Sequence, residues 1–385
     1  MTTEMPAPVM KSGLICSLCK KTYNYNVLQT VSACCSQPLI SENFYKPANS
    51  AEIITNEPSM WRYRALLPAL KNTDVVSLGE GWTPMVHLLK TSNQLQQDIW
   101  LKDESVNPTG SFKARGMSVA VSRLKEFGIK NCAIATAGNA GGALSAYCAK
   151  AGIKATIFMP AQTPALLKEE CEMFGATVVL VDGLIDACGK SVTEFIKVTG
   201  AFNVSTFKEP YRLEGKKTLG YEIAEQLQWK LPDVILYPTG GGTGYIGMWK
   251  AFQEMKALGW IGNHLPRMVI VQSQNCAPMK HIYERGFIPD DFKPEPSDAY
   301  GLAVPYPFAK DIMAEVLNES GGTVVTVSEH EIQSGMSEIA GSEGILLGPE
   351  GSATYMGLKK LIKKDWLKQD ESALIFNTGS WARYH

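Results

Sequence analysis

The chain has 385 residues, with 37 basic and 38 acidic side chains and a formal net charge of −1. This balance, with an isoelectric point of about 6.5, excludes the basic footprint that is typical of nucleic-acid binding. The longest uncharged stretch, residues 131–149, is too weakly apolar to span a bilayer, and the N-terminus lacks the apolar stretch of a secretory signal. We therefore expect a cytoplasmic protein with no nucleic-acid or membrane partner.

Four of the nine cysteines lie near the N-terminus, as Cys16 and Cys19 followed by the adjacent Cys34 and Cys35. Two CxxC pairs are typical of a zinc site. Here the second pair is broken, because Ser32 occupies the position of its first cysteine. Zinc binding and a degenerate ribbon that serves only for packing remain alternatives, and we assign no metal site. We expect the other cysteines to be reduced and buried: Cys132, Cys148, Cys171, Cys188 and Cys276.

Short apolar strands alternate with helices from about residue 58 onward. The predicted strands cover residues 99–102, 132–136, 154–159, 177–181, 234–237, 268–271, 323–327 and 373–376. The predicted helices cover residues 112–127, 140–151, 164–174 and 184–199, with a further helix that ends near residue 258. This alternation indicates an α/β protein whose parallel sheets are covered on both faces. Residues 287–309 are predicted to form an ordered surface loop near a ligand or subunit contact.

The first segment with chemical interest is Asn107-Pro-Thr-Gly-Ser-Phe-Lys113-Ala-Arg-Gly116. It follows a predicted strand and begins a helix, and open parallel sheets bind ligands at such places. The positive end of the helix, burial by Phe112 and repulsion from Arg115 would all favour a neutral Lys113 amine. A neutral lysine attacks aldehydes and forms a Schiff base. The alternative is an ordinary surface lysine at the start of a helix.

Two further loops after predicted strands are rich in glycine. Residues 136–142 offer backbone N–H groups to a carboxylate and Asn139 to a phenolate or carbonyl oxygen, although the same residues also form ordinary tight turns. Residues 237–247 contain a glycine cluster whose N–H groups would converge on one phosphate. No Lys-Ser or Lys-Thr pair follows, as a Walker loop would require. None of the five histidines lies in these loops, so a metal-bound water or a Ser-His mechanism has little support. A lysine amine together with a site for a single phosphate points to pyridoxal phosphate.

With the closing segment Asn377-Thr-Gly-Ser380, these motifs resemble the fold-type II pyridoxal-phosphate enzymes. Within that group, Gly79-Glu-Gly-Trp-Thr-Pro84, the run from Glu209 to Glu222 and the CxxC start are similar to the threonine synthases. The resemblance implies a fold like that of the tryptophan synthase β chain, with two open parallel-sheet α/β domains. It implies a ribbon-like segment over residues 1–50, a large cofactor-binding domain over 51–110 and 213–385, and a small α/β domain over 111–212.

The same resemblance implies roles for individual residues. Lys113 would bind the cofactor aldehyde and act as the catalytic base, Asn139 would contact the ring oxygen, and Thr378 would face the pyridine nitrogen. The cofactor phosphate would be held by Gly240, Gly241, Gly242, Thr243 and Gly244. The substrate carboxylate would be bound by the loop that contains Thr136, Ala137, Gly138 and Ala140. The substrate phosphate would be bound by Arg212, with Lys208 and Lys216 as nearby cations.

The reaction implied by the resemblance converts O-phospho-L-homoserine and water to L-threonine and phosphate. It is a β,γ-elimination and replacement, catalysed by a carbon–oxygen lyase that is expected to be a homodimer. Threonine or serine dehydratase and cysteate synthase are alternatives within the same fold, although a dehydratase has no need of the cations Lys208, Arg212 and Lys216. A catalytically silent, phosphate-binding regulatory protein is an alternative from another class, but it has no reason to retain both Lys113 and Thr378.

Overall fold

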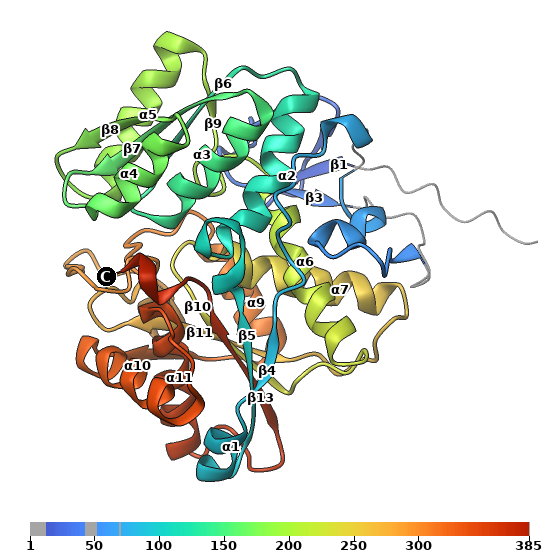
Figure 1. The fold of residues 1–385 in the computed structure, drawn as a ribbon, viewed down its shortest axis with the longest axis vertical. Coiled ribbons are helices and arrows are strands. Elements are labelled where there is room, and N and C mark those ends of the chain that lie inside the picture. The colour runs from blue at the N-terminus through green and yellow to red at the C-terminus, as the bar shows by residue number, and fades with distance from the viewer. Residues whose placement is uncertain (1–12, 43–51, 69–70, 385) are drawn as a thin grey trace, which may run out of the picture.

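The computed structural model describes residues 13–42, 52–68 and 71–384. Figure 1 shows two sheets, each with helices beside it, and a small separate sheet formed by the N-terminal ribbon. The parts of the predicted ribbon at residues 1–12 and 43–50 lie outside the described residues. The large sheet lies in the lower half of that view and the four-stranded sheet in the upper half.

The large sheet has six strands in the order β12-β11-β10-β13-β5-β4. Its neighbours pair in parallel, except that β4 runs antiparallel to β5 at the edge of the sheet. In the centre, Ile235 is in register with Met268 on one side and Leu374 on the other. The strands are β4 (Met85–His87), β5 (Asp98–Asp103), β10 (Val234–Pro238), β11 (Arg267–Ser273), β12 (Val324–Val327) and β13 (Ser372–Asn377).

The smaller sheet has four strands, all parallel, in the order β8-β7-β6-β9. They are β6 (Asn131–Ala135), β7 (Lys154–Pro160), β8 (Thr177–Val181) and β9 (Phe202–Asn203). The helices that connect them are α3 (Asn139–Ala151), α4 (Ala165–Met173) and α5 (Ile185–Thr199). Because every connection is a crossover helix, the carboxyl ends of these strands lie at one edge, together with the loops that follow them.

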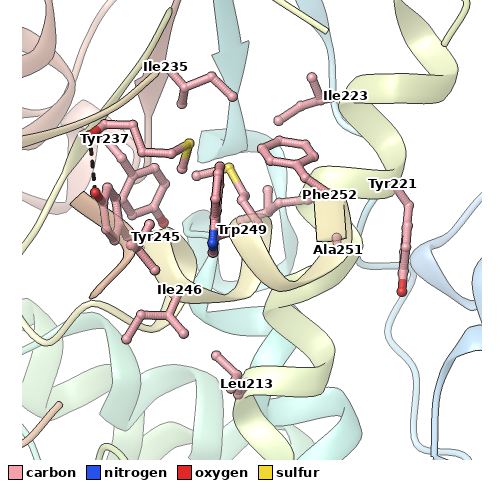
Figure 2. Close-up of a cluster of buried hydrophobic side chains, with 14 of the residues drawn as sticks. Leu213, Tyr221, Ile223, Ile235, Tyr237, Tyr245, Ile246, Trp249, Ala251 and Phe252 are labelled. Atoms are coloured by element: carbon pink, nitrogen blue, oxygen red, sulfur yellow. Dashed lines mark hydrogen bonds between the residues drawn. The ribbon is translucent and has the colours of Figure 1, made fainter. Parts of the chain in front are cut away.

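The remaining helices pack mainly on the large sheet and between the two sheets. They are α1 (Leu89–Leu95), α2 (Lys113–Glu126), α6 (Tyr211–Gln226), α7 (Thr243–Ala257), α8 (Pro278–Arg285), α9 (Lys310–Ser320), α10 (Glu329–Glu343) and α11 (Pro349–Lys363). Figure 2 shows how Trp249 and Phe252 of α7 pack with Ile223 of α6 and Ile235 of β10. This core fixes α7, and therefore the glycine loop at its N-terminus, against the sheet.

Most of the predicted elements are confirmed within one or two residues at their ends, and the strand at 177–181 is confirmed at both ends. Several elements were not predicted, namely β4, β9, α1, α6 and α8 to α11. The five cysteines expected in the core are buried. Among the described residues, no helix has the length and apolar character needed to cross a membrane.

A buried group of charged side chains joins three of these elements. Arg115 of α2 donates to both oxygens of Glu104, after β5, at 2.7 Å, and to both oxygens of Glu222 of α6 at 2.9 Å. The Lys102 ammonium adds a 2.6 Å bond to Glu222. All four side chains are fully buried. Because each charge has an opposite partner, the network holds α2, and its first residue Lys113, in a fixed position.

Candidate active site

A cavity of about 460 Å³ lies where loops from both parallel sheets meet. Its wall includes the residues that follow β6 of the small sheet and those that follow β10 and β13 of the large sheet. The start of α2 adds Lys113, and the irregular segment between α8 and α9 adds much of the rest, from Pro294 to Phe308. The expectation that this segment borders a ligand site agrees with its place on the cavity wall.

Lys113 is the first residue of α2 and lines the cavity. Its Nζ lies 4.3 Å from the centre of the Phe112 ring. The pKa of Lys113 is lowered to about 8, mainly by burial and also by the Arg212 guanidinium, while the Glu350 carboxylate acts in the opposite direction. A substantial part of the amine is therefore neutral near pH 8, as the sequence predicted.

The cation that repels Lys113 differs from the one expected. Arg115 was expected to repel this amine, but its guanidinium is neutralised by Glu104 and Glu222. Arg212, in the first turn of α6, acts in its place. The expectation for Arg115 was wrong because sequence proximity does not show which way a helical side chain points.

The lowered pKa of Lys113 makes a testable prediction for assembly of the holoenzyme. Only the neutral amine attacks an aldehyde, so the rate of cofactor binding to the apoenzyme should rise about tenfold per pH unit below about pH 8 and level off above it. Stopped-flow absorbance of the bound cofactor measures this rate. Glu350→Gln removes the carboxylate that raises this pKa, so the midpoint should move to lower pH. A rate of cofactor binding that keeps rising to pH 10 would mean that the pKa of Lys113 is not lowered.

The glycine loop lies at the N-terminus of α7, which begins at Thr243. A Cβ atom on Gly240 would lie 2.2 Å from the Gly301 carbonyl oxygen, and one on Gly244 would lie 2.0 Å from the Tyr237 hydroxyl. Gly242 has a φ of +82°, which is in the left-handed region that favours glycine. The first turn of a helix leaves N–H groups without intrahelical partners, and its dipole is positive. The loop therefore offers a compact site for an anion.

Gly240→Ala should weaken cofactor binding strongly, by about tenfold or more. The added methyl group would displace either the loop or the Gly301 backbone, and so move the N–H groups away from the phosphate. The dissociation constant can be measured by titration of apoenzyme with pyridoxal phosphate. Gly262→Ala is the matched control, because a Cβ there meets nothing within 4 Å. Equal affinities for the two variants would contradict a phosphate site at this loop.

Asn139 and Thr378 both line the cavity. The Asn139 amide donates to the Tyr384 hydroxyl at 3.2 Å, and its oxygen accepts a 2.6 Å bond from Arg383. Arg383 is itself paired with Glu170 of α4. The C-terminal residues therefore hold the Asn139 side chain. The Thr378 carbonyl accepts a 3.0 Å bond from the Phe112 N–H, which ties the end of β13 to the segment that carries Lys113.

The loop predicted to bind a substrate carboxylate also lies on the wall, with Thr136, Ala137, Gly138 and Ala140 all lining the cavity. The Thr136 hydroxyl accepts a 3.1 Å bond from the Gly138 N–H, which closes the turn before α3. Of the three predicted cations, Lys208 lines the cavity. Its Nζ lies 3.6 Å from the centre of the Phe308 ring, and burial lowers its pKa.

The other two predicted cations, Arg212 and Lys216, are buried and do not line the cavity. Arg212 donates to the Val204 carbonyl at 2.9 Å and to the Thr206 hydroxyl at 3.4 Å, and Thr206 is on the wall. Lys216 donates to the Phe112 carbonyl, and burial together with repulsion from Lys113 lowers its pKa well below the ordinary value. Both cations therefore lie beneath the residues that line the cavity, where Arg212 lowers the pKa of Lys113.

Several wall residues were missed by the sequence analysis. Glu350, in the first turn of α11, accepts a 2.8 Å bond from the Gly301 N–H, and burial raises its pKa. Tyr300 stacks on Tyr384 with ring centres 6.0 Å apart. The Tyr237 hydroxyl is buried with no hydrogen-bond partner among the described residues. Of these residues only Glu350 had a recognisable sequence pattern, since Pro349-Glu350 indicates the start of a helix, but this pattern does not indicate a ligand site.

These residues fit pyridoxal phosphate. The amine of Lys113 would bind the aldehyde, the glycine loop has no room for side chains and would hold the phosphate, and Asn139 and Thr378 would supply polar contacts. The fold and the cavity therefore define a pyridoxal-phosphate-dependent enzyme.

Comparison with known proteins gives the same class. The family model described as pyridoxal-phosphate dependent enzyme matches residues 76–379. The threonine synthase of Methanosarcina acetivorans is 34% identical over 330 residues, which cover 84% of this chain and 80% of that protein. The threonine synthase of Methanocaldococcus jannaschii is 31% identical over 372 residues, which cover 94% of this chain and 91% of that protein. The chain therefore belongs to the pyridoxal-phosphate-dependent enzymes and, within them, to the threonine synthase family.

Solved structures agree on the fold. A threonine deaminase from Solanum lycopersicum has a TM-score of 0.67 at 21% identity, covering 92% of this chain and 95% of that chain. Maize serine racemase has a TM-score of 0.66 at 21% identity, covering 77% of this chain and 88% of that chain. The predictions of a fold-type II α/β architecture and of pyridoxal phosphate as cofactor are confirmed.

Proposed function

We propose that this chain is a threonine synthase, which converts O-phospho-L-homoserine and water to L-threonine and phosphate. The observation that carries the proposal is that Lys113 and the glycine loop face one cavity, in a chain 34% identical to a threonine synthase. Lys208 on the same wall supports a phosphorylated substrate. Because the pKa of Lys113 is lowered to about 8, the lysine is suited to proton transfer near neutral pH.

Different side chains and loops of the chain transfer protons, contact the cofactor ring and bind the substrate carboxylate. Bound pyridoxal phosphate supplies an electron sink next to the substrate α-carbon. Lys113 takes the α-proton and then carries protons at the neighbouring carbon. Thr378 presents a neutral hydroxyl, which cannot hold a pyridine nitrogen protonated as a carboxylate would, so elimination and replacement are favoured over transamination. The turn at residues 136–140 orients the substrate carboxylate through its N–H groups.

The test is a side-by-side assay of the purified holoenzyme. Phosphate and threonine released from O-phospho-L-homoserine should appear in equal amounts, while formation of 2-oxobutyrate from threonine and of pyruvate from serine should be far slower. Faster oxo-acid formation would identify a dehydratase instead. Colourless protein without a borohydride-reducible adduct would favour the silent regulatory protein.

Lys208→Ala should raise the KM for the phosphorylated substrate by about tenfold while changing kcat less. A charge-assisted bond to a phosphate contributes about 1.5–3 kcal/mol, and 1.4 kcal/mol corresponds to tenfold. Lys208→Arg is the matched control, because it retains the positive charge above Phe308. Inhibition by inorganic phosphate should weaken in parallel. An unchanged KM in the alanine variant would remove Lys208 from the substrate site.

The proposal also includes the division into a ribbon, a large domain over residues 51–110 and 213–385 and a small domain over 111–212, in a cytoplasmic homodimer. The separate parallel sheets support this division. Sedimentation equilibrium of the holoenzyme would measure the mass of the assembly, and a monomer would contradict the dimer.

A further inference from the structure

The N-terminal ribbon brings four thiols together. Its strands β1 (Gly13–Cys16), β2 (Thr22–Asn24) and β3 (Leu39–Glu42) form an antiparallel sheet in the order β2-β1-β3. At one end of this sheet, the sulfur atoms of Cys16, Cys19, Cys34 and Cys35 all lie within 4.8 Å of one another. A tetrahedral Zn²⁺ with Zn–S bonds of about 2.3 Å requires sulfur atoms about 3.8 Å apart. The four thiols are therefore close enough to share one ion.

Two turns with the same backbone pattern carry these thiols. In the first, the Cys16 N–H donates to the Lys21 carbonyl at 2.9 Å, and the Lys20 N–H donates to the Cys16 carbonyl at 3.0 Å. In the second, the Ser32 N–H donates to the Gln37 carbonyl at 2.9 Å, and the Ser36 N–H donates to the Ser32 carbonyl at 2.8 Å.

The match extends to the backbone angles. Lys20 and Ser36 occupy the same place in the two turns, and both are in the left-handed region, with φ of +59° and +54°. Both residues directly follow a cysteine of the cluster, Cys19 in one turn and Cys35 in the other. Non-glycine residues rarely adopt this conformation, so its occurrence at both positions shows that the two turns have the same backbone shape.

The second turn provides its two thiols in a different way from the first. Ser32 occupies the place of the first cysteine in the second turn, and its hydroxyl is buried and accepts the Gln37 N–H at 3.0 Å. The missing thiol comes from Cys34, which lies two residues further along. Its N–H donates to the Tyr23 hydroxyl of β2 at 2.9 Å, and its sulfur lies 3.2 Å from that of Cys19. Adjacent cysteines can therefore both reach the cluster.

We propose that Cys16, Cys19, Cys34 and Cys35 bind one structural Zn²⁺ ion. All four ligands are thiolates, which suits zinc and leaves no open position for a substrate. The ribbon is too small to bury a core of its own, and folded segments of this size usually depend on a metal or disulfides. The site is independent of the pyridoxal phosphate cavity and of the proposed reaction.

The ribbon contacts the helices that position the cofactor lysine. Arg123 of α2 donates to the Tyr25 carbonyl at 3.3 Å and lies 4.1 Å from the centre of the Tyr25 ring. Ser41 of β3 donates to Glu214 of α6. Zinc at the ribbon would therefore stabilise its packing on α2 and α6, through residues that do not line the cavity. Its removal should lower the thermal midpoint of the holoenzyme.

The test is the metal content of the purified full chain, prepared under reducing conditions with zinc in the growth medium. Mass spectrometry of the metals should find one zinc ion per chain in the wild type and in Cys188→Ala, whose thiol is buried outside the cluster. Cys19→Ala should lose at least tenfold of the bound zinc. Substitution with Co²⁺ should give the intense thiolate-to-metal absorption of a four-sulfur site.

A compensating variant keeps the proposal testable if single variants fold poorly. Cys34→Ala should lose zinc, and the double change Ser32→Cys with Cys34→Ala should restore it, because the second turn then carries two cysteines in the spacing of the first. The proposal is overturned if the wild type contains no metal, if Cys19→Ala retains it, or if a Cys19–Cys34 disulfide occupies the site in the reduced preparation.

Discussion

Lys113→Ala should abolish turnover of the phosphorylated substrate, with a loss of at least about 10³-fold in kcat. The variant loses both the amine that binds the cofactor aldehyde and the group that moves the protons, and proton transfer by a positioned side chain alone contributes about 10²–10⁴-fold. Steady-state phosphate release measures the loss. In the wild type, borohydride reduction followed by peptide mapping should find the cofactor attached at Lys113.

The matched control is Lys125→Ala, on the same helix. Lys125 is exposed, its Nζ donates to the Thr73 carbonyl at 2.6 Å, and neither residue lines the cavity. That variant should retain wild-type kcat and cofactor content. Near-normal activity in Lys113→Ala, with intact secondary structure in both variants, would remove Lys113 from the chemistry.

Local sequence patterns predicted the short apolar strands and the helices with an apolar stripe. The apolar strand at 177–181 and the helix at 184–199 were both found at nearly the predicted bounds. Helix α6 was not assigned, because every residue from Tyr211 to Ala224 is buried, including Lys216 and Lys217. A helix with no exposed face has no apolar stripe to detect. Its charged side chains instead find buried partners, as Glu222 does with Arg115 of α2 and Lys217 with Glu254 of α7.

The residues of the candidate site also fall into those that the sequence predicted and those that it did not. The lysine segment and both glycine loops were recognisable because their chemistry depends on residues adjacent in the sequence. The supporting contacts were not, because they join distant segments: Asn139 with Tyr384, and Glu350 with Gly301. The roles of Arg212 and Lys216 depended on which side of α6 faces the cavity, and the sequence did not specify this. Long-range packing therefore decided which predicted cation reaches the wall, namely Lys208.

Arg115→Leu should lower the free energy of unfolding by about 3–5 kcal/mol, because it leaves buried carboxylates without their partner. In the wild type, burial alone would raise the pKa of Glu104, but the adjacent Arg115 holds it below the ordinary value. The same balance lowers the pKa of Glu222, with Lys102 contributing. Urea unfolding of the apoenzyme at pH 7 measures the loss. Lys197→Ala, which removes an exposed ion pair with Glu194, should change the midpoint little.

The pH dependence of the stability of Arg115→Leu shows whether the loss comes from an unpaired buried carboxylate or from poorer packing. Without Arg115, burial raises the pKa of Glu104, so the folded variant binds a proton more tightly than the unfolded chain does. Its stability should therefore rise, relative to wild type, as the pH falls from 7 toward 5, and the deficit should shrink. In the wild type the paired carboxylates have lowered pKa values, so their contribution is lost only as the pH falls below the ordinary carboxyl range. A deficit that stays constant over this interval would mean that Arg115 stabilises the chain through packing rather than through its charge.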